Sequence, residues 1–359
     1  MTEIEELKIR ILADGIRIDD STRVELNQKI GGPLSLFDYC TTQGIILKFT
    51  NSNIFVNADF LFDYCKKSLV KLCFDNNCLV VSYKEKNYPV NVYPVPSYFD
   101  KQTTKGSPYS KLIATHGDRA RISPIMGCSF GCQFCDFPLI EYTKTDVKEM
   151  LGAINVAVSD AQLPAKHLLI SGGTPRFEDR PWLIDVFKTI TKKSPIPVDI
   201  MVAAWIDKKL IIDFKNWGVN ELSINIEVWD QTIASKLIVG KNKLSREKYI
   251  EVLKEAVNVF GHGKVRCMLL VGLEPLESTL EGIKKLSEIG VSPVLSPFRP
   301  APNTALKNHS RPTYGDLLYV WNEGKKIAAK YKIKLGPNCI PCTHNTLTIP
   351  DNSDFYHYN

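Results

Sequence analysis

The sequence predicts an α/β fold, a partial or near-complete (β/α) barrel of the TIM type with an N-terminal α+β extension. From Arg119 onward, apolar runs of strand length alternate with segments of helical periodicity, which is typical of a parallel sheet joined by crossover helices. Before that point the pattern is irregular and partly strand-like. We therefore expect an N-terminal α+β region at 1–118, a barrel at 119–336 and a C-terminal tail at 337–359.

The strands expected in the barrel are short apolar runs at 120–126, 167–171, 197–204, 221–228, 265–271, 292–297 and 333–335. Amphipathic helices are expected between them, at 145–159, 182–192, 208–217, 245–259, 278–289 and 314–330. The eighth strand of a complete barrel is not evident, so the sheet is either open or curled into a partial barrel.

Two hairpins are expected in the N-terminal region. An Asn-rich turn at 75–77 separates two β-rich runs, and a second turn of this kind at 51–53 separates another pair. The stretch 89–110 contains four prolines, which favours an extended connector over regular structure.

Composition and charge exclude several classes of protein. The chain has 359 residues, 44% of them hydrophobic and 23% charged, which suits a folded protein with a large core. A net charge of +6, spread along the chain, gives no reason to expect nucleic acid as a partner. The acidic N-terminal segment has no apolar core of a secretory signal, and no run of about 18 uncharged apolar residues exists. We expect a cytoplasmic protein that does not contact a membrane, whose 10 cysteines are thiols or metal ligands.

The most informative motif is the cysteine loop that follows the first expected barrel strand. It reads Gly127-Cys128-Ser129-Phe130-Gly131-Cys132-Gln133-Phe134-Cys135. Thiolates are soft ligands suited to iron–sulfur clusters or zinc, and three on one short loop can converge on one centre. Three thiolates would leave one iron of a cubane cluster open to a further ligand. The alternative is a structural zinc loop that takes its fourth ligand from elsewhere.

The C-x3-C-x2-C spacing, with an aromatic residue before the last cysteine, resembles the radical S-adenosylmethionine (SAM) superfamily. The resemblance covers about 119–336 and implies that Cys128, Cys132 and Cys135 hold a [4Fe-4S] cluster. It also implies that SAM binds the fourth iron and is cleaved, after one-electron reduction, to methionine and a 5′-deoxyadenosyl radical. Phe134 takes the place of the aromatic residue beside the adenine.

A glycine-rich segment, Ser171-Gly172-Gly173-Thr174-Pro175, follows the second expected strand. It resembles the segment of the superfamily that meets the SAM amino group through backbone atoms. The resemblance therefore assigns Gly172, Gly173 and Thr174 to SAM binding, and glycine permits such close approach.

Alternation along the expected strand at 221–228 places Ser223, Asn225 and Glu227 on one face. Asn225 and Glu227 resemble an Asn-x-Asp pair that holds the SAM ribose in the biotin synthase branch, with Glu in place of Asp. Leu270, on the next strand, would pack on the adenine. Arg266 shares the inward parity of Leu270 and suits a carboxylate of SAM or substrate, or a salt bridge that closes the barrel.

Arg299 and a Cys-x2-Cys pair near the C-terminus complete the candidates for catalytic residues. Arg299 lies in Pro297-Phe298-Arg299-Pro300, which is similar to a substrate-side loop of the same branch. Cys339 and Cys342 follow the last expected strand, so we expect them at the barrel mouth. This pair could bind a second iron–sulfur cluster, bind a zinc ion, form a redox pair or act as a radical quencher. In biotin synthases the corresponding strand end contributes a ligand to an auxiliary cluster that donates sulfur.

The sequence therefore predicts a radical SAM enzyme of the biotin synthase and lipoyl synthase-like branch. It would abstract hydrogen from a C–H bond of a small-molecule or protein-bound substrate, with sulfur insertion as one outcome. Rearrangement, methylation or epimerisation without sulfur transfer is the alternative within the superfamily. A non-catalytic iron–sulfur or zinc protein is the alternative of another class, although such a protein needs neither the glycine-rich segment nor Asn225 and Glu227. Flavodoxin or ferredoxin is the expected kind of reducing partner.

Overall fold

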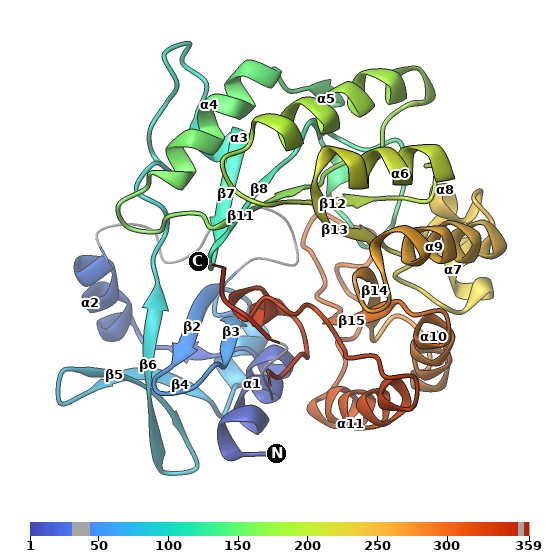
Figure 1. The fold of residues 1–359 in the computed structure, drawn as a ribbon. Helices are drawn as coiled ribbons and strands as arrows, with labels where there is room; N and C mark the ends of the chain where they lie inside the picture. Colours follow the sequence, from blue (N-terminus) through green and yellow to red (C-terminus); the bar gives the residue numbers. More distant parts are fainter. Residues whose placement is uncertain (31–43, 351–354, 359) are drawn as a thin grey trace.

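The computed structural model describes residues 1–30, 44–350 and 355–358, and a curved seven-stranded sheet dominates it (Figure 1). The strand order is β15-β14-β13-β12-β11-β8-β7. Strands β8, β11, β12, β13, β14 and β15 run parallel, and β7 pairs antiparallel with β8 at one edge. The strands are β7 (Ile113–His116), β8 (Arg119–Ile122), β11 (His167–Ile170), β12 (Val198–Val202), β13 (Val219–Ile224), β14 (Val265–Val271) and β15 (Ser292–Pro297). The predicted fold class, a partial barrel with an N-terminal extension, is confirmed.

The helices that follow the parallel strands cover the outer face of this sheet (Figure 1). They are α4 (Val147–Val158), α5 (Arg180–Lys193), α6 (Lys208–Trp217), α9 (Arg246–Phe260), α10 (Leu276–Glu288) and α11 (Tyr314–Lys330). All of them match expected helices to within a few residues. Several begin at a side chain that accepts a hydrogen bond from the first turn, namely Asp146, Asp207, Ser245 and Thr313. Two short helices, α7 (Gln231–Leu237) and α8 (Val239–Asn242), were not expected.

Two of the expected barrel strands differ in the structure. The run at 333–335 is not a strand, and the chain makes a single bridge there, between Gly336 and Val294. Pro337 has no N–H with which to extend the pairing. The run at 120–126 is interrupted, because β8 ends at Ile122 and β9 (Ile125–Met126) pairs instead with β10 (Thr143–Lys144). The prediction of a strand at 333–335 and that of an uninterrupted strand at 120–126 were therefore both wrong.

The N-terminal region forms a second, six-stranded sheet of order β1-β4-β5-β6-β2-β3. Both expected hairpins are present, as β4–β5 and β2–β3, and the turn residues Asn76 and Asn77 have positive φ. The expected connector at 89–110 begins as strand, because β6 extends to Tyr93. The strands are β1 (Arg17–Ile18), β2 (Ile45–Phe49), β3 (Phe55–Ala58), β4 (Lys71–Asp75), β5 (Cys78–Tyr83) and β6 (Lys86–Tyr93), with α1 (Glu3–Asp14), α2 (Asp20–Ile30) and α3 (Tyr109–Leu112) beside them.

The N-terminal region and the C-terminal segment lie together on the open side of the curved sheet, between its two edge strands (Figure 1). Helix α1 packs on α11, and β3 packs on the 3-10 turn η4 (Pro341–Asn345). The buried Lys8 Nζ donates to the carbonyl of Thr343 at 2.9 Å and to that of Thr348. These contacts close the lumen of a sheet that does not close on itself. Among the described helices, none combines the length and apolar character needed to span a bilayer.

Candidate functional site

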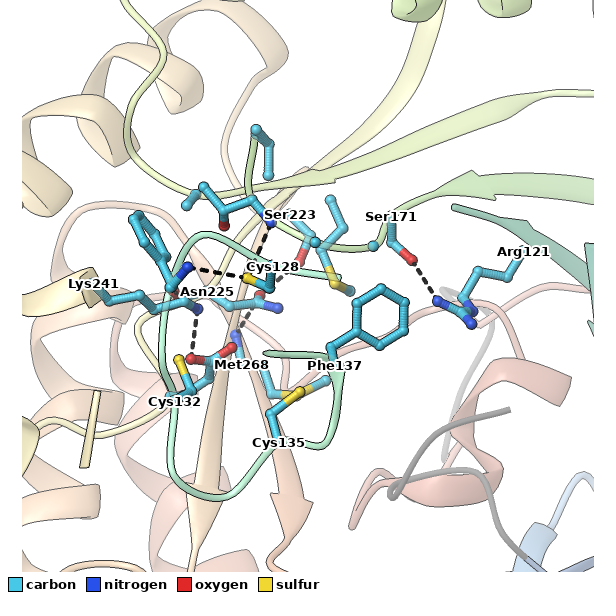
Figure 2. Close-up of a pocket in the computed structure, with 18 of the residues that line it drawn as sticks. Arg121, Cys128, Cys132, Cys135, Phe137, Ser171, Ser223, Asn225, Lys241 and Met268 are labelled. Atoms are coloured by element: carbon cyan, nitrogen blue, oxygen red, sulfur yellow. Dashed lines mark hydrogen bonds and ion pairs between the residues drawn. The ribbon is translucent and has the colours of Figure 1, made fainter. Parts of the chain in front are cut away.

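A cavity lies on the inner side of the curved sheet, where the cysteine loop meets the strand ends (Figure 2). Every residue expected from the sequence to bind the cluster or SAM lines it. These residues are Phe134, Gly172, Gly173, Thr174, Asn225, Glu227, Leu270, Cys128, Cys132 and Cys135. Four separate segments of the chain therefore converge on one space, at the edge where barrel enzymes carry out their chemistry.

The cysteine loop is held from two sides. Cys128 Sγ accepts hydrogen bonds from the backbone N–H of Thr174 at 3.2 Å and of Phe130 at 3.4 Å. The backbone N–H of Gln133 donates to the carbonyl of Leu237, at the end of α7. Backbone N–H groups aimed at a sulfur stabilise negative charge on it, which is the form in which a thiol binds metal.

The glycine-rich segment lies directly against the cysteine loop. Gly173 N donates to the carbonyl of Ile125 at 3.2 Å, and a Cβ added at Gly173 would lie 1.5 Å from the carbonyl oxygen of Gly127. Gly172 has φ +130, a conformation that side chains rarely adopt. The glycines therefore bring two backbones together at the cavity wall and leave the wall free of side chains there.

Asn225 presents a fixed amide to the cavity at the end of β13. Its Oδ1 accepts hydrogen bonds from Ser223 Oγ at 2.9 Å and from the backbone N–H of Met268 at 3.0 Å (Figure 2). Within the described part of the chain, Asn225 Nδ2 makes no hydrogen bond. The amide is therefore oriented by its oxygen, and its N–H groups remain for a ligand.

Glu227 forms a buried ion pair that the sequence did not reveal. Its Oε2 lies 2.5 Å from Nζ of Lys241, on α8, and its backbone has φ +69. Burial disfavours the charged amine, but the Glu227 carboxylate outweighs it and raises the pKa of Lys241. No motif marks the α7–α8 segment, so nothing local predicted a cation beside Glu227.

The donor set of the cysteine loop fits an iron–sulfur cluster. Burial raises the pKa of Cys132, and that of Cys135 to about 12, because a thiolate loses its hydration there. Metal binding must therefore displace protons from both sulfurs. Three cysteines beside an open cavity suit a cluster with one free coordination position.

Arg121 is a further cation on the cavity wall. Alternation along β8 turns Arg119 and Arg121 to the same side of the sheet, and both line the cavity. Nη1 of Arg121 donates to Ser123 Oγ at 3.0 Å. It also donates to Ser171 Oγ at 3.5 Å (Figure 2). Sequence reasoning missed Arg121, although its position two residues after Arg119 on an expected strand was a usable signal.

The two arginines singled out from the sequence are both engaged in ion pairs. Arg266 lines the cavity, and its Nε lies 3.0 Å from Glu221 while its Nη2 lies 3.6 Å from Asp199. This favours the salt bridge that closes the barrel over a ligand contact. Arg299 is not among the residues that line the cavity, and its Nη1 lies 3.2 Å from Asp59 of the N-terminal region. It joins the two parts of the chain, in place of the substrate-side role expected for it.

The expectation that Cys339 and Cys342 lie at the barrel mouth was wrong. Both sulfurs contact His167, the first residue of β11, at the edge of the sheet opposite the cysteine loop. The missing strand at 333–335 explains this, because the chain crosses the open side of the sheet instead of running to its carboxyl edge. Cys342 lines the floor of the cavity. The partners of the pair lie far away in the sequence, and no motif pointed to them.

A three-cysteine loop at the carboxyl edge of a curved parallel sheet, with a glycine-rich turn and a polar strand end beside it, defines an α/β metalloenzyme. The family model of the radical SAM superfamily matches residues 122–286, somewhat less than half of the chain, and this match indicates a radical SAM enzyme. The predictions of the superfamily and of an enzyme are therefore confirmed, and a non-catalytic metal protein is set aside. Assignment to the biotin synthase and lipoyl synthase-like branch stays a prediction.

Solved structures of several radical SAM proteins are similar to parts of this chain. Methylornithine synthase (PylB) is 17% identical, with a TM-score of 0.45 over 60% of this chain and 70% of that one. The FeFe-hydrogenase maturase HydG from Carboxydothermus hydrogenoformans is 15% identical, with a TM-score of 0.48 over 61% and 54%. A radical SAM methyltransferase from Sphaerobacter thermophilus is 14% identical, with a TM-score of 0.49 over 75% and 76%. No curated protein matches the sequence.

Proposed function

We propose that this enzyme abstracts a hydrogen atom from a C–H bond of a small anionic molecule that binds in the cavity beside SAM. One observation carries the proposal. The cysteine loop, the glycine-rich turn and the polar end of β13 line the same cavity as several cationic side chains of the barrel. SAM and a second ligand would thus share one space, with the cluster at its carboxyl-edge end.

The SAM half of the site follows from the residues already described. Gly172, Gly173 and Thr174 would meet the amino group through their backbone, and the free N–H groups of Asn225 would bind the ribose, with Glu227 beside them. Phe134 and Leu270 would contact the adenine. When bound to Cys128, Cys132 and Cys135, a [4Fe-4S] cluster supplies the electron that splits SAM into methionine and the 5′-deoxyadenosyl radical. The protein's own work is to hold both ligands close and to exclude water.

The charge of the cavity wall supports an anionic substrate. Among the described lining residues, Arg119, Arg121, Lys241 and Arg266 are cationic and Glu227 alone is acidic. Lys241 is paired with Glu227, and Arg266 is paired with Glu221 and Asp199 behind the cavity wall. The planar guanidinium of Arg121 suits a carboxylate or phosphate, and it lines the cavity while donating to the hydroxyls of Ser123 and Ser171. The N-terminal region and the C-terminal segment cover the open side of the sheet, which favours a small molecule over a protein-bound substrate.

The geometry favours a reaction without sulfur insertion. The case for an auxiliary sulfur-donating cluster depended on Cys339 and Cys342 at the barrel mouth. Their sulfurs lie instead at the opposite edge, within contact of a single imidazole. We therefore place rearrangement, methylation or epimerisation ahead of sulfur insertion.

A reducing partner such as flavodoxin or ferredoxin and a reducing compartment such as the cytoplasm belong to the same proposal. All of the cysteines that the structure describes are free thiols. This state suits a compartment in which thiols and iron–sulfur clusters persist.

The test is the formation of 5′-deoxyadenosine by anaerobically reconstituted protein with SAM and a reductant. Small molecules from a cell extract are divided by ion exchange, and only the anionic fraction should stimulate the reaction. Arg121→Gln should lose this stimulation and Arg121→Lys should retain part of it. Arg23→Gln, an exposed position on α2, serves as the matched control. Stimulation by the cationic fraction alone, or an Arg121→Gln variant equal to wild type, would contradict the proposal.

SAM labelled with deuterium in its methyl group distinguishes the reaction classes. Label in the product indicates methylation, and an unlabelled product of unchanged mass indicates rearrangement or epimerisation. A product that gains the mass of sulfur would overturn the preference stated above.

A further inference from the structure

Four side chains with metal-ligating atoms meet at the N-terminal edge of the curved sheet. Asp118 lies in the turn between β7 and β8, His167 begins β11, and Cys339 and Cys342 come from the C-terminal segment. One ligand atom from each lies within 4.8 Å of the ligand atoms of the other three. His167, Cys339 and Cys342 are almost completely buried, and the Asp118 side chain is 13% exposed.

Four of the six distances between these atoms are close to the edges of one coordination tetrahedron. His167 Nε2 lies 3.2 Å from Cys342 Sγ, 3.5 Å from Cys339 Sγ and 3.4 Å from Asp118 Oδ1. Cys339 Sγ lies 3.5 Å from the same carboxylate oxygen. A zinc ion with bonds of about 2.3 Å to sulfur and about 2.0–2.1 Å to nitrogen and oxygen sets these edges at roughly 3.3–3.6 Å. We propose that Asp118, His167, Cys339 and Cys342 bind one Zn²⁺ ion.

The surroundings of His167 orient it as a metal ligand. Its Nδ1 lies 3.3 Å from Oδ2 of the buried Asp199, so that Nε2 is left for the ion. Asn220 Nδ2 in turn donates to Asp199 Oδ1 at 2.9 Å, and the ring of Tyr358 stacks on His167 at a centroid distance of 4.0 Å. A carboxylate that receives the second N–H of a histidine is typical of zinc sites, where it fixes the ring and strengthens the ligand.

The turn that carries Asp118 is shaped to meet the cysteine segment. Gly117 has φ +64, and a Cβ there would lie 3.0 Å from Cβ of Pro341, between the two cysteines. The backbone N–H of Ile340 donates to the carbonyl of Tyr356, which holds the same segment from its other side. The ligands thus come from elements that are fixed independently of one another.

The donor set selects zinc over an iron–sulfur cluster. The ligands of a cubane bind different irons, whereas these four atoms lie within 4.8 Å of one another, close enough to share one ion. Two thiolates, one imidazole and one carboxylate in a tetrahedron suit Zn²⁺. Because four protein ligands fill the tetrahedron and most of it is buried, the site is closed and structural. It would fasten the C-terminal segment to the barrel floor.

Metal analysis of the anaerobically purified full chain, produced in zinc-supplemented medium, tests the proposal. Wild type should hold about one zinc per chain in addition to its iron. The variant Cys339→Ser/Cys342→Ser should lose the zinc and keep the iron, and Cys128→Ala/Cys132→Ala/Cys135→Ala should do the reverse. Cys73→Ser/Cys78→Ser, at two cysteines of the β4–β5 hairpin, is the matched control and should keep both metals. This readout does not depend on SAM cleavage, so it stands apart from the proposed function.

Three results would overturn the assignment: wild type without zinc, zinc retained in Cys339→Ser/Cys342→Ser, or loss of iron from that variant in place of zinc. In case the double variant does not fold, two measurements use chains with all four ligands intact. Wild type loaded with Co²⁺ should show thiolate-to-cobalt charge transfer and the strong visible bands of a tetrahedral ion, and octahedral bands would contradict the proposal. Asp199→Asn should bind zinc about 10–100-fold more weakly in chelator competition, and unchanged affinity would remove Asp199 from its positioning role.

Discussion

Replacing Gly173 with alanine tests whether the glycine-rich turn holds the cysteine loop in place. A Cβ at this position would lie 1.5 Å from the carbonyl oxygen of Gly127, and the next atoms are backbone atoms of Gly127 and Cys128. Ordinary contact begins near 3.4 Å, so the two backbones must separate by roughly 2 Å. No flexible side chain is available to absorb that shift, and Cys128 must move with its neighbour.

The expected cost of Gly173→Ala is about 1–3 kcal/mol of folding stability, as for other overpacked sites. The functional loss should be larger, because a displacement of about 1 Å in a catalytic arrangement can reduce rate by roughly a hundredfold. We expect incomplete iron incorporation, and at least a hundredfold slower formation of 5′-deoxyadenosine per cluster. Iron analysis and product quantification after anaerobic reconstitution measure the two effects.

Gly131→Ala is the matched control, because Gly131 lies in the same cysteine loop but a Cβ there meets no atom within 4 Å. It should incorporate iron and cleave SAM as wild type does. If Gly173→Ala also behaved as wild type, the turn would not be positioning the loop, and the close approach would have no functional meaning. If both variants failed equally, general sensitivity of the loop would explain the result.

Two further predictions follow from single side chains. Asn225→Ala removes the free amide N–H groups and should weaken SAM binding by about 1 kcal/mol, or roughly fivefold in Kd, at unchanged iron content; calorimetry that finds an unchanged Kd would exclude the contact. Burial lowers the pKa of Lys8 well below its ordinary value of 10.5. At a pH between the lowered pKa and 10.5, the unfolded chain holds a proton on Lys8 that the folded chain does not. The free energy of unfolding of wild type, measured in urea titrations, should therefore rise from pH 8 to pH 10 by up to about 1.4 kcal/mol per pH unit relative to that of Lys8→Met. The same pH dependence in both proteins would refute the lowered pKa.

The features that the sequence predicted are local ones. The C-x3-C-x2-C loop, the Gly172-Gly173 turn and the polar face of the strand at Asn225 each lie within a few residues, and the strand period decides which side chains share a face. Since parallel strands end at the same edge of a sheet, local motifs that follow several strands must meet there. The cavity could therefore be predicted without knowing any long-range contact.

The features that the sequence did not predict depend on contacts between distant segments. Cys339 contacts His167 across 172 residues and Asp118 across 221 residues, and neither partner belongs to a motif. Lys241 contacts Glu227 from the short helix α8, which the hydrophobic periodicity of the sequence did not predict. The error at 333–335 led to the error about Cys339, because a strand there would have carried Cys339 to the opposite edge of the sheet.

The cysteine loop (Cys128, Cys132, Cys135) and the proposed zinc site (Cys339, Cys342) lie at opposite ends of the same two strands, which separates their roles. Strand β8 begins next to Asp118 and leads to the cysteine loop, and β11 begins at His167 and leads to Gly172. Each of these strands has 4 residues, so about 13 Å of rigid sheet divides the proposed zinc site from the SAM-binding edge. Loss of zinc should therefore leave SAM binding intact. It should instead disturb the cavity floor, where Cys342 lies, and impair coupling of SAM cleavage to product formation before it impairs cleavage itself.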